Sequence, residues 1–399
     1  MALVLALLYE TRPESEWKPY IDLFPREFDT LMYWTPLELQ ALTGSAVLGK
    51  IGKDEAEEKF RSILGPVINS YKDLFETTEL QFNNLTGEVD ESSLLSCAHR
   101  MASCIMSYSF DLEKNVSHSN TTNNSDPEDE GEDAQHYKAM VPLADLLNAD
   151  ADKINARLFQ HPSSLTMSPL HDLPAQTPLY NDYGPLPRSD LLRRYGYVTK
   201  NYAQFDVVEL RGDLLTETII GMKNPTLSPE EQLKRVDLLI DEELLEDAFD
   251  LSAPDPGAEN IPNEWVWIYA VLTQPVGEEP SLPSSSSVKK VMKARGYKEC
   301  VGEVLRKRLA MYPPKEKIEP GLVSGEEVSA RTKKRVEMAR QVREGEIEIL
   351  EALISEVEGW VVGEENPTKL KVREDWGGKR KVDGSSSSSV GANRKKPRK

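Results

Sequence analysis

Residues 180–197, "YNDYGPLPRSDLLRRYGY", decide how this 399-residue chain is interpreted. They hold four tyrosines and two glycines. Asn-Asp, Gly-Pro and Leu-Pro are turn-forming pairs, so the first half predicts a turn, and the second half is typical of a helix. A second polar turn, "LADLLNADADKIN" (143–155), lies between apolar runs, where Asn and Asp are typical of a helix end. Taken singly, each segment indicates no more than an ordinary turn.

The wider periodicity predicts several regular elements. Apolar residues recur three and four positions apart over 50–75, 92–112, 228–251 and 326–358, which predicts helices. In the third of these, Ser228, the following proline and Glu231 match a helix capping box. The stretch "QFDVVELRGDLLTETI" (204–219) predicts a strand followed by a helix.

Together and in this order, the two polar turns resemble parts of a SET domain, the knot-like β fold of protein lysine methyltransferases. The match resembles the branch that includes the Rubisco large-subunit methyltransferase and the ribosomal-protein lysine methyltransferases. It rests on "MVPLADLLNADADKINARLF" (140–159) and on residues 180–210. Other pieces resemble that branch's helical insert, its next segment and the last helix of its C-terminal domain: "SEWKPYIDLFPREFDTLMYW" (15–34) with "LQALTGSA" (39–46), "SCIMSYSFDL" (103–112) and "QVREGEIEIL" (341–350).

The resemblance implies an α+β chain, in which an incomplete SET domain of small knotted β-sheets precedes an all-α substrate-binding domain. We expect the SET domain over 1–210, lacking its N-terminal part and with its helical insert at about 13–90. The polar segment 113–135 has six acids among residues 126–133 and predicts a disordered loop. The helical domain is expected over 211–360, followed by a disordered basic tail over 361–399.

The resemblance also implies an activity, protein-lysine N-methylation with S-adenosyl-L-methionine as cofactor. A free lysine has a pKa of about 10.4, so its amine must be desolvated to lose its proton at neutral pH. Tyrosine rings suit such a channel because they exclude water and attract the cation. By resemblance, the catalytic and cofactor-binding residue is Tyr183, the other cofactor contacts are Asn148, Tyr108 and the backbone of Ala149, and the lysine-channel residues are Tyr195 and Tyr197.

Two departures from the family pattern affect this interpretation. SET domains begin with a strand-turn segment carrying a G-x-G-like loop, and no such loop precedes "MALVLALLYE" (1–10). The segment 160–179 stands where the family has two apolar strands, but it contains four prolines and no strand alternation. We therefore expect this segment to lack strands. A shifted reading frame, an incorrect exon join or a missed N-terminus would explain both features.

Composition excludes several other classes of function. The net charge of −19 disfavours nucleic acid and anionic membranes as partners. Three cysteines without C-x-x-C spacing indicate neither a disulfide scaffold nor a thiolate zinc site, and they favour buried positions in a reducing compartment. No apolar run approaches the ~20 residues needed to span a bilayer. The five histidines match no metal or hydrolase motif.

The leading hypothesis is thus a monomeric nuclear methyltransferase that acts on a ribosomal protein of the large subunit. Its basic tail would engage a nuclear import receptor, although a solubilising tail is the simpler reading. Two alternatives stay open. One is a catalytically impaired SET-like protein, or a truncated gene model, that binds a protein substrate without methylating it. The other is an acidic nuclear scaffold unrelated to SET enzymes.

Overall fold

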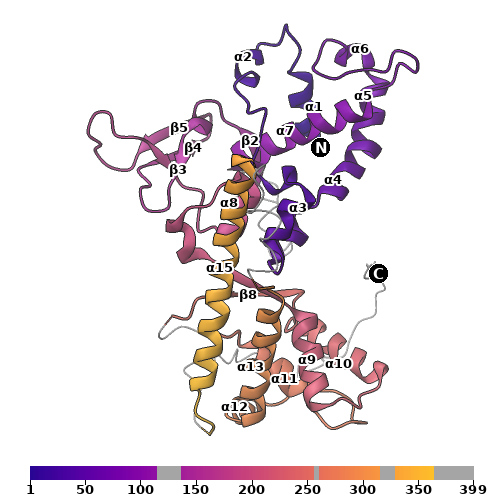
Figure 1. The fold of residues 1–399 in the computed structure, drawn as a ribbon, viewed down its shortest axis with the longest axis vertical. Helices are drawn as coiled ribbons and strands as arrows, with labels where there is room; N and C mark the ends of the chain where they lie inside the picture. Colours follow the sequence, from indigo (N-terminus) through magenta and orange to yellow (C-terminus); the bar gives the residue numbers. More distant parts are fainter. Residues whose placement is uncertain (115–135, 256–259, 315–328, 364–399) are drawn as a thin grey trace, which may run out of the picture.

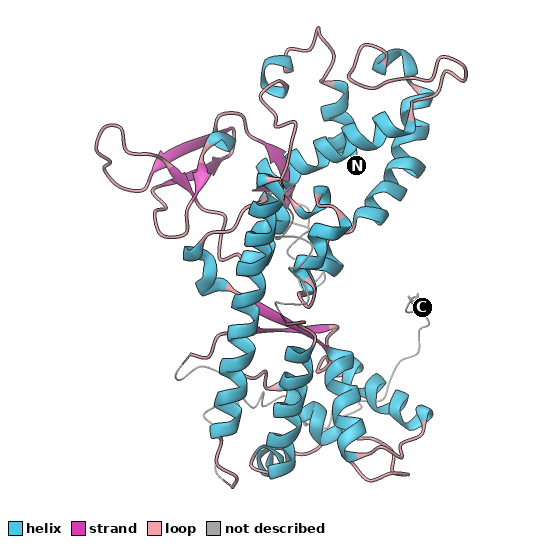
Figure 2. Ribbon diagram, viewed as in Figure 1, coloured by secondary structure: helices cyan, strands magenta, loops and turns pink. Residues whose placement is uncertain are grey.

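A computed structural model of the chain describes residues 1–114, 136–255, 260–314 and 329–363. Most of the predicted acidic loop and nearly all of the predicted basic tail therefore lie outside the described residues. Figure 1 shows an N-terminal part of helices and small sheets at the top, a mainly helical part at the bottom, and helix α15 running between them. Helices dominate and the strands are short (Figure 2).

The N-terminal helices form around the apolar opening of the chain. Helix α1 packs against α7, and their apolar faces share one core with Phe60, Leu64 and Ile68. The predicted helix over 50–75 forms as successive segments, with a π-helical stretch at Phe60–Leu64 between α4 and α5. The helices are α1 (Ala2–Tyr9), α2 (Lys18–Ile21), α3 (Pro36–Leu39), α4 (Lys53–Lys59), α5 (Gly65–Ser70), α6 (Lys72–Phe75) and α7 (Glu91–Tyr108).

The prediction of one helix over 92–112 is wrong at its end. Helix α7 ends at Tyr108, and strand β1 (Ser109–Glu113) follows directly. β1 pairs antiparallel with β2 (His136–Met140), so partners far along the chain satisfy its backbone groups and override the local helical periodicity. The prediction that Cys97 and Cys104 lie in the core is confirmed for Cys104, which is buried, whereas Cys97 is partly buried; Cys300 is also buried.

Two further small sheets join the segments on either side of the proline-rich region. Strand β3 (Asn148–Ala149) pairs in parallel with β6 (Tyr180–Asn181). Between them in the sequence, β4 (Ala156–His161) and β5 (Ser164–Pro169) form an antiparallel hairpin. The expectation that 160–179 lacks strands is therefore wrong. A solvent-exposed hairpin needs no apolar alternation, and Pro169 stands at its last position, where the missing N–H is tolerated.

The C-terminal part begins with the predicted strand and helix, β7 (Val207–Arg211) and α9 (Gly212–Lys223). The capping box of Ser228 and Glu231 starts α10 (Pro229–Asp241) as predicted. The all-α prediction is not confirmed, because β8 (Ala248–Ser252) pairs with β7 and lies where the periodicity predicted helix. The remaining helices are α8 (Arg188–Tyr195), which precedes β7, α11 (Glu264–Leu272), α12 (Ser285–Met292), α13 (Arg295–Ala310) and α15 (Ala330–Gly359).

Helix α15 joins the two parts of the molecule. Near its start, the buried Arg335 donates from Nη1 to Glu38 Oε2 at 2.8 Å and pairs with Asp29. Further along, the buried Glu346 accepts hydrogen bonds from Ser45 at 2.7 Å and Tyr312 at 2.8 Å. One helix thereby holds residues of the first 50 positions against the C-terminal core. The expected domain boundaries, the insert at about 13–90 and the knotted threading stay predictions.

Candidate functional site

A stack of tyrosines forms where the turn of 180–187 meets α8. The rings of Tyr183 and Tyr195 lie 4.1 Å apart between centroids and are nearly parallel, at 6°. Tyr197 meets Tyr195 edge-on, with 6.5 Å between centroids. All three side chains are partly buried. The structure thus brings together the predicted catalytic residue and the two predicted lysine-channel residues.

The geometry of α8 places this stack. Tyr195 is the last residue of the helix, and Gly196 ends it in the left-handed conformation with φ of 75°. A Cβ at Gly196 would lie 2.8 Å from the backbone of Asp29 and Thr30, so only glycine fits both the turn and this approach. Ser107 on α7 donates its hydroxyl to the Arg194 carbonyl at 2.7 Å. The C-terminal end of α8 is therefore fixed next to α7.

Asn155 holds the other side of the site. Its side chain donates to the Pro178 carbonyl and accepts from the Tyr180 N–H, both at 2.9 Å. Its backbone N–H and carbonyl bond Tyr180 and Leu170. The residue is buried. Asn155 therefore ties the two ends of the proline-rich segment together, so that β6 can pair with β3.

A cavity of about 190 Å³ opens beside the tyrosine stack. Tyr183, Tyr195 and Tyr108 line it. Two further lining residues are the buried Asn181 and Asp145. These residues come from α7, from β6, from the turn between β6 and α8, from α8, and from the 3-10 helix Ala144–Leu146 before β3. Its wall combines aromatic rings with charged side chains, so a space of this size suits a linear chain with a polar end.

The predicted cofactor residues lie close to this cavity through strand pairing. Asn148 pairs with Tyr180 and Ala149 with Asn181, which places both within a few residues of Tyr183. Asn148 is exposed and Ala149 is partly buried. Of the predicted cofactor residues, Tyr108 and Tyr183 line the cavity directly. The assigned roles of these residues stay predictions.

Burial controls the ionisation of the tyrosines. It raises the pKa of Tyr183 and Tyr197 well above the usual value, and neighbouring tyrosines add to both shifts. Burial likewise raises the pKa of Tyr195 and Tyr108. The nearby Tyr202, whose buried hydroxyl has no hydrogen-bond partner among the described residues, has its pKa raised to about 12. These hydroxyls are therefore neutral at physiological pH, where each can donate and accept hydrogen bonds.

Asp145 was missed by the sequence analysis. It lines the cavity beside the tyrosines and also a more apolar hollow of about 320 Å³, which Tyr20, Leu143 and Leu146 share. Tyr20 donates its hydroxyl to Asp145 Oδ2, and burial together with this carboxylate raises the pKa of Tyr20. Asp145 Oδ1 is buried and has no partner among the described residues. A carboxylate with one uncompensated oxygen attracts a cation. In the sequence, only its position three residues before the predicted cofactor residue Asn148 could have indicated that Asp145 belongs to the site.

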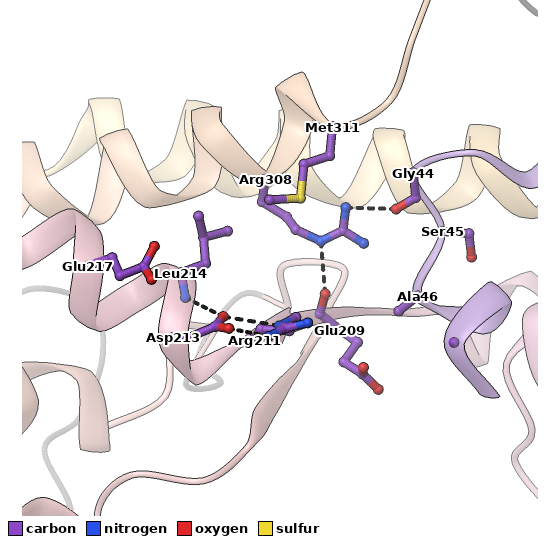
Figure 3. Close-up of a pocket in the computed structure, with 11 residues that line it drawn as sticks. Gly44, Ser45, Ala46, Glu209, Arg211, Asp213, Leu214, Glu217, Arg308 and Met311 are labelled. Carbon is purple, nitrogen blue, oxygen red and sulfur yellow. Dashed lines mark hydrogen bonds and ion pairs between the residues drawn. The ribbon is translucent and has the colours of Figure 1, made fainter. Parts of the chain in front are cut away.

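A larger hollow lies elsewhere, at the joint between the two parts of the molecule. It measures about 520 Å³ and lies between the loop at Gly44, strand β7 and helices α9 and α13 (Figure 3). Arg308 donates to the carbonyls of Gly44 and Glu209 at 2.9 Å each, and Arg211 pairs with Asp213. The guanidinium groups of Arg308 and Arg211 are thus engaged in contacts within the protein. The tyrosine-lined cavity, although smaller, is the better candidate site.

The described residues contain no group of His, Cys, Asp and Glu side chains that could hold a metal ion. Within the same ranges, no helix is long and apolar enough to cross a membrane.

Comparison with known proteins places the fold. A scan against models of known protein families finds no match. A solved structure of the Rubisco LSMT SET domain bound to lysine and AdoHcy superimposes with a TM-score of 0.56 at 18% identity, and covers 89% of this chain and 73% of that one. Rubisco LSMT bound to sinefungin and monomethyllysine gives 0.53 at 17% identity, with the same coverage. The chain therefore has a fold similar to that of the SET domain of Rubisco LSMT.

Curated proteins that are similar in sequence to this chain carry consistent names. Ribosomal lysine N-methyltransferase 4 of Saccharomyces cerevisiae is 36% identical over 225 residues, which span 55% of this chain but only 42% of the yeast protein. The Schizosaccharomyces pombe protein of the same name is 26% identical and aligns over 93% of this chain and 82% of its own length. Human N-lysine methyltransferase SETD6 is 26% identical over 88% of this chain and 73% of the human protein.

Proposed function

We propose that this chain is an S-adenosylmethionine-dependent protein-lysine N-methyltransferase whose reaction takes place in the cavity lined by Tyr183, Tyr195 and Tyr108. The observation that carries the proposal is the Tyr183–Tyr195 ring stack beside a cavity of about 190 Å³, next to the β3–β6 pair. The names of the relatives support it.

The residues at the cavity fit both a lysine and a sulfonium cofactor. Both ligands carry positive charge, and the aromatic faces of Tyr183 and Tyr195 together with Asp145 attract cations. Asn148 has an exposed side chain and Ala149 a backbone at the edge of this wall, so both are available to hold the cofactor. When bound, S-adenosylmethionine supplies a methyl group on a positively charged sulfur.

The chain's own residues prepare the amine. The partly buried rings exclude water from the lysine side chain, which disfavours its charged form and lowers its pKa. Because the tyrosine hydroxyls stay protonated, Tyr183 can donate or accept a hydrogen bond but does not take the lysine proton. The proton leaves to solvent as the amine enters the cavity. Positioning the neutral nitrogen then supplies much of the rate.

The substrate and the place of action extend this proposal. A ribosomal protein of the large subunit is the proposed target, which both yeast relatives support through their names. The two clusters of basic residues in 361–399 support nuclear import. We further propose that the chain acts as a monomer.

The test combines binding with catalysis. Calorimetry with S-adenosylmethionine should show binding by the unmodified chain, and transfer of a labelled methyl group to large-subunit ribosomal proteins should follow. Tyr183→Phe should lower kcat about 100-fold, since a small misplacement of the amine has an effect of that size. Tyr137→Phe, a change at an exposed tyrosine on β2, is the matched control and should leave kcat unchanged. A chain that binds no cofactor would instead be the impaired binding protein.

A further inference from the structure

Helix α15 contacts α8, the helix that ends in the tyrosine stack, although α15 contributes no residue to the cavity. It runs beside α8, the helix that ends at Tyr195 (Figure 1). At a rise of about 1.5 Å per residue, the eight residues of α8 span about 12 Å. Ten steps along α15, from Arg335, which pairs with Asp29, to Gly345, span about 15 Å. The two anchor points of α15 described next therefore match the two ends of α8.

The first anchor lies at the N-terminal end of α8. Pro187 precedes the helix and has no side chain that could cap it, so the cap comes from Asp206 instead. Asp206 Oδ1 accepts from the Arg188 backbone N–H at 2.8 Å, and Oδ2 accepts from Arg188 Nε at 2.7 Å. Both residues are buried. A buried, hydrogen-bonded ion pair of this kind loses most when either partner is removed.

Gly345 of α15 lies directly over this ion pair. A Cβ at position 345 would overlap Arg188 Nη2 and Asp206 Oδ2. The glycine has no unusual backbone dihedral, since it lies inside a regular helix. Its role is therefore close packing: it lets α15 seal the Arg188–Asp206 pair from water.

The second anchor lies at the C-terminal end of α8. Gly196, which ends that helix, lies so close to the backbone of Asp29 that an added Cβ would be 2.8 Å from it. Asp29 in turn pairs with Arg331 at 2.9 Å and with Lys334 at 3.0 Å, both from the first turns of α15. These charges hold the pKa of Asp29 below its usual range. Residues of α15 therefore contact the structure at both ends of α8.

We propose that α15 sets the position of α8, and through it the Tyr183–Tyr195 stack, with Gly345, Arg188 and Asp206 as positioning residues. The inference rests on the proposed function for its catalytic consequence. It assigns the C-terminal helix a role in aligning the reaction site, separate from the binding of substrate.

A direct measurement does not need methyl transfer. 3-Fluorotyrosine is placed at position 195 of the full chain and its fluorine resonance is recorded, because the ring of Tyr183 at 4.1 Å shifts that resonance. Gly345→Ala and the milder Asp206→Asn should both move the signal toward the position seen in Tyr183→Ala. Gly221→Ala, a helical glycine with open space around it, is the matched control and should leave it in place. An unmoved resonance in a folded Gly345→Ala or Asp206→Asn chain overturns the proposal.

Kinetics supply the second measurement. Asp206→Asn should lower kcat about tenfold, and the same change in a Tyr195→Ala background should lower it less than about twofold, since the two act through one stack. Equal losses in both backgrounds overturn the positioning role. If the unmodified chain transfers no methyl group, the proposed function fails, while the fluorine measurement still decides the role of α15.

Discussion

The two parts of this molecule are built in contrasting ways. In α11, every residue from Trp265 to Leu272 is buried, and the C-terminal core extends over α9, α12, α13 and the end of α15. The hairpin β4–β5 beside the candidate site is mostly exposed, and the segment around it depends on hydrogen bonds from Asn155. Burial of apolar surface stabilises the first region, whereas a few directed contacts shape the second. We therefore expect substitutions in the helical core to change the free energy of unfolding, and substitutions beside the candidate site to change mainly the local structure there.

The strongest way to break this contrast is Trp265→Ala in the helical core. Trp265 is fully buried and meets Phe249 edge-on at 6.1 Å. We expect unfolding free energy to fall by about 3–5 kcal/mol, from lost apolar burial and the cavity left behind. Urea denaturation measures this loss. Trp17→Ala, at a tryptophan that is 54% exposed, is the control and should lower the free energy by less than about 1 kcal/mol. Equal losses would contradict the contrast.

The joint between the two parts should respond to pH through Glu346. Burial raises the pKa of Glu346 from 4.5 to about 7, despite its hydrogen bonds from Ser45 and Tyr312. A carboxyl whose folded pKa is raised contributes its full stability below its unfolded pKa and loses it as pH rises to the folded pKa. Stability should therefore fall by about 3 kcal/mol between about pH 4.5 and 7.

Glu346→Gln tests this expectation, because the amide resembles the neutral carboxyl. The variant should match the unmodified chain near pH 4.5 and exceed its unfolding free energy by about 3 kcal/mol at pH 8. Glu348→Gln, at an exposed position of the same helix, is the control and should leave the pH dependence unchanged. A pH profile that Glu346→Gln does not flatten would rule out this assignment.

The smallest expected effect on stability belongs to the site itself. Asn155→Ala removes both side-chain hydrogen bonds and leaves the Tyr180 N–H and the Pro178 carbonyl without these partners. We expect a local loss of about 1–2 kcal/mol, seen as faster amide hydrogen exchange at Tyr180, with little change in global unfolding. Thr166→Ala, on the exposed face of the hairpin, should leave exchange at Tyr180 unchanged. A global loss as large as that of Trp265→Ala would contradict the separation of the two regions.

Sequence patterns predicted the parts of the fold that local periodicity controls. The cap of α10 at Ser228 and the strand-to-helix step at Arg211 both follow from neighbouring residues. Patterns failed where distant partners decide the structure. β8 forms because β7 lies beside it, and the hairpin β4–β5 forms in spite of its prolines because Asn155 closes its ends.

The candidate site divides in the same way. Tyr183, Tyr195 and Tyr197 could be named because one short segment resembles a known family, and in the structure a turn and a two-turn helix bring their rings together. Asp145 and Tyr20 meet only in the folded chain, 125 positions apart, and no spacing rule connects them. The anchor of α8 on Gly345 was equally invisible, because a glycine inside a helix carries no signal of what packs over it.

The long reach of α15 has a consequence for how the chain is made. The buried carboxylate of Glu38 finds its partner Arg335 only 297 positions later. At synthesis rates of about 5–20 residues per second, that arginine is added roughly 15–60 s after the glutamate. During this interval the N-terminal part has an uncompensated acid at the surface that α15 will later cover. The packing of the N-terminal part on α15 can therefore form only after residues 330–359 have been synthesised.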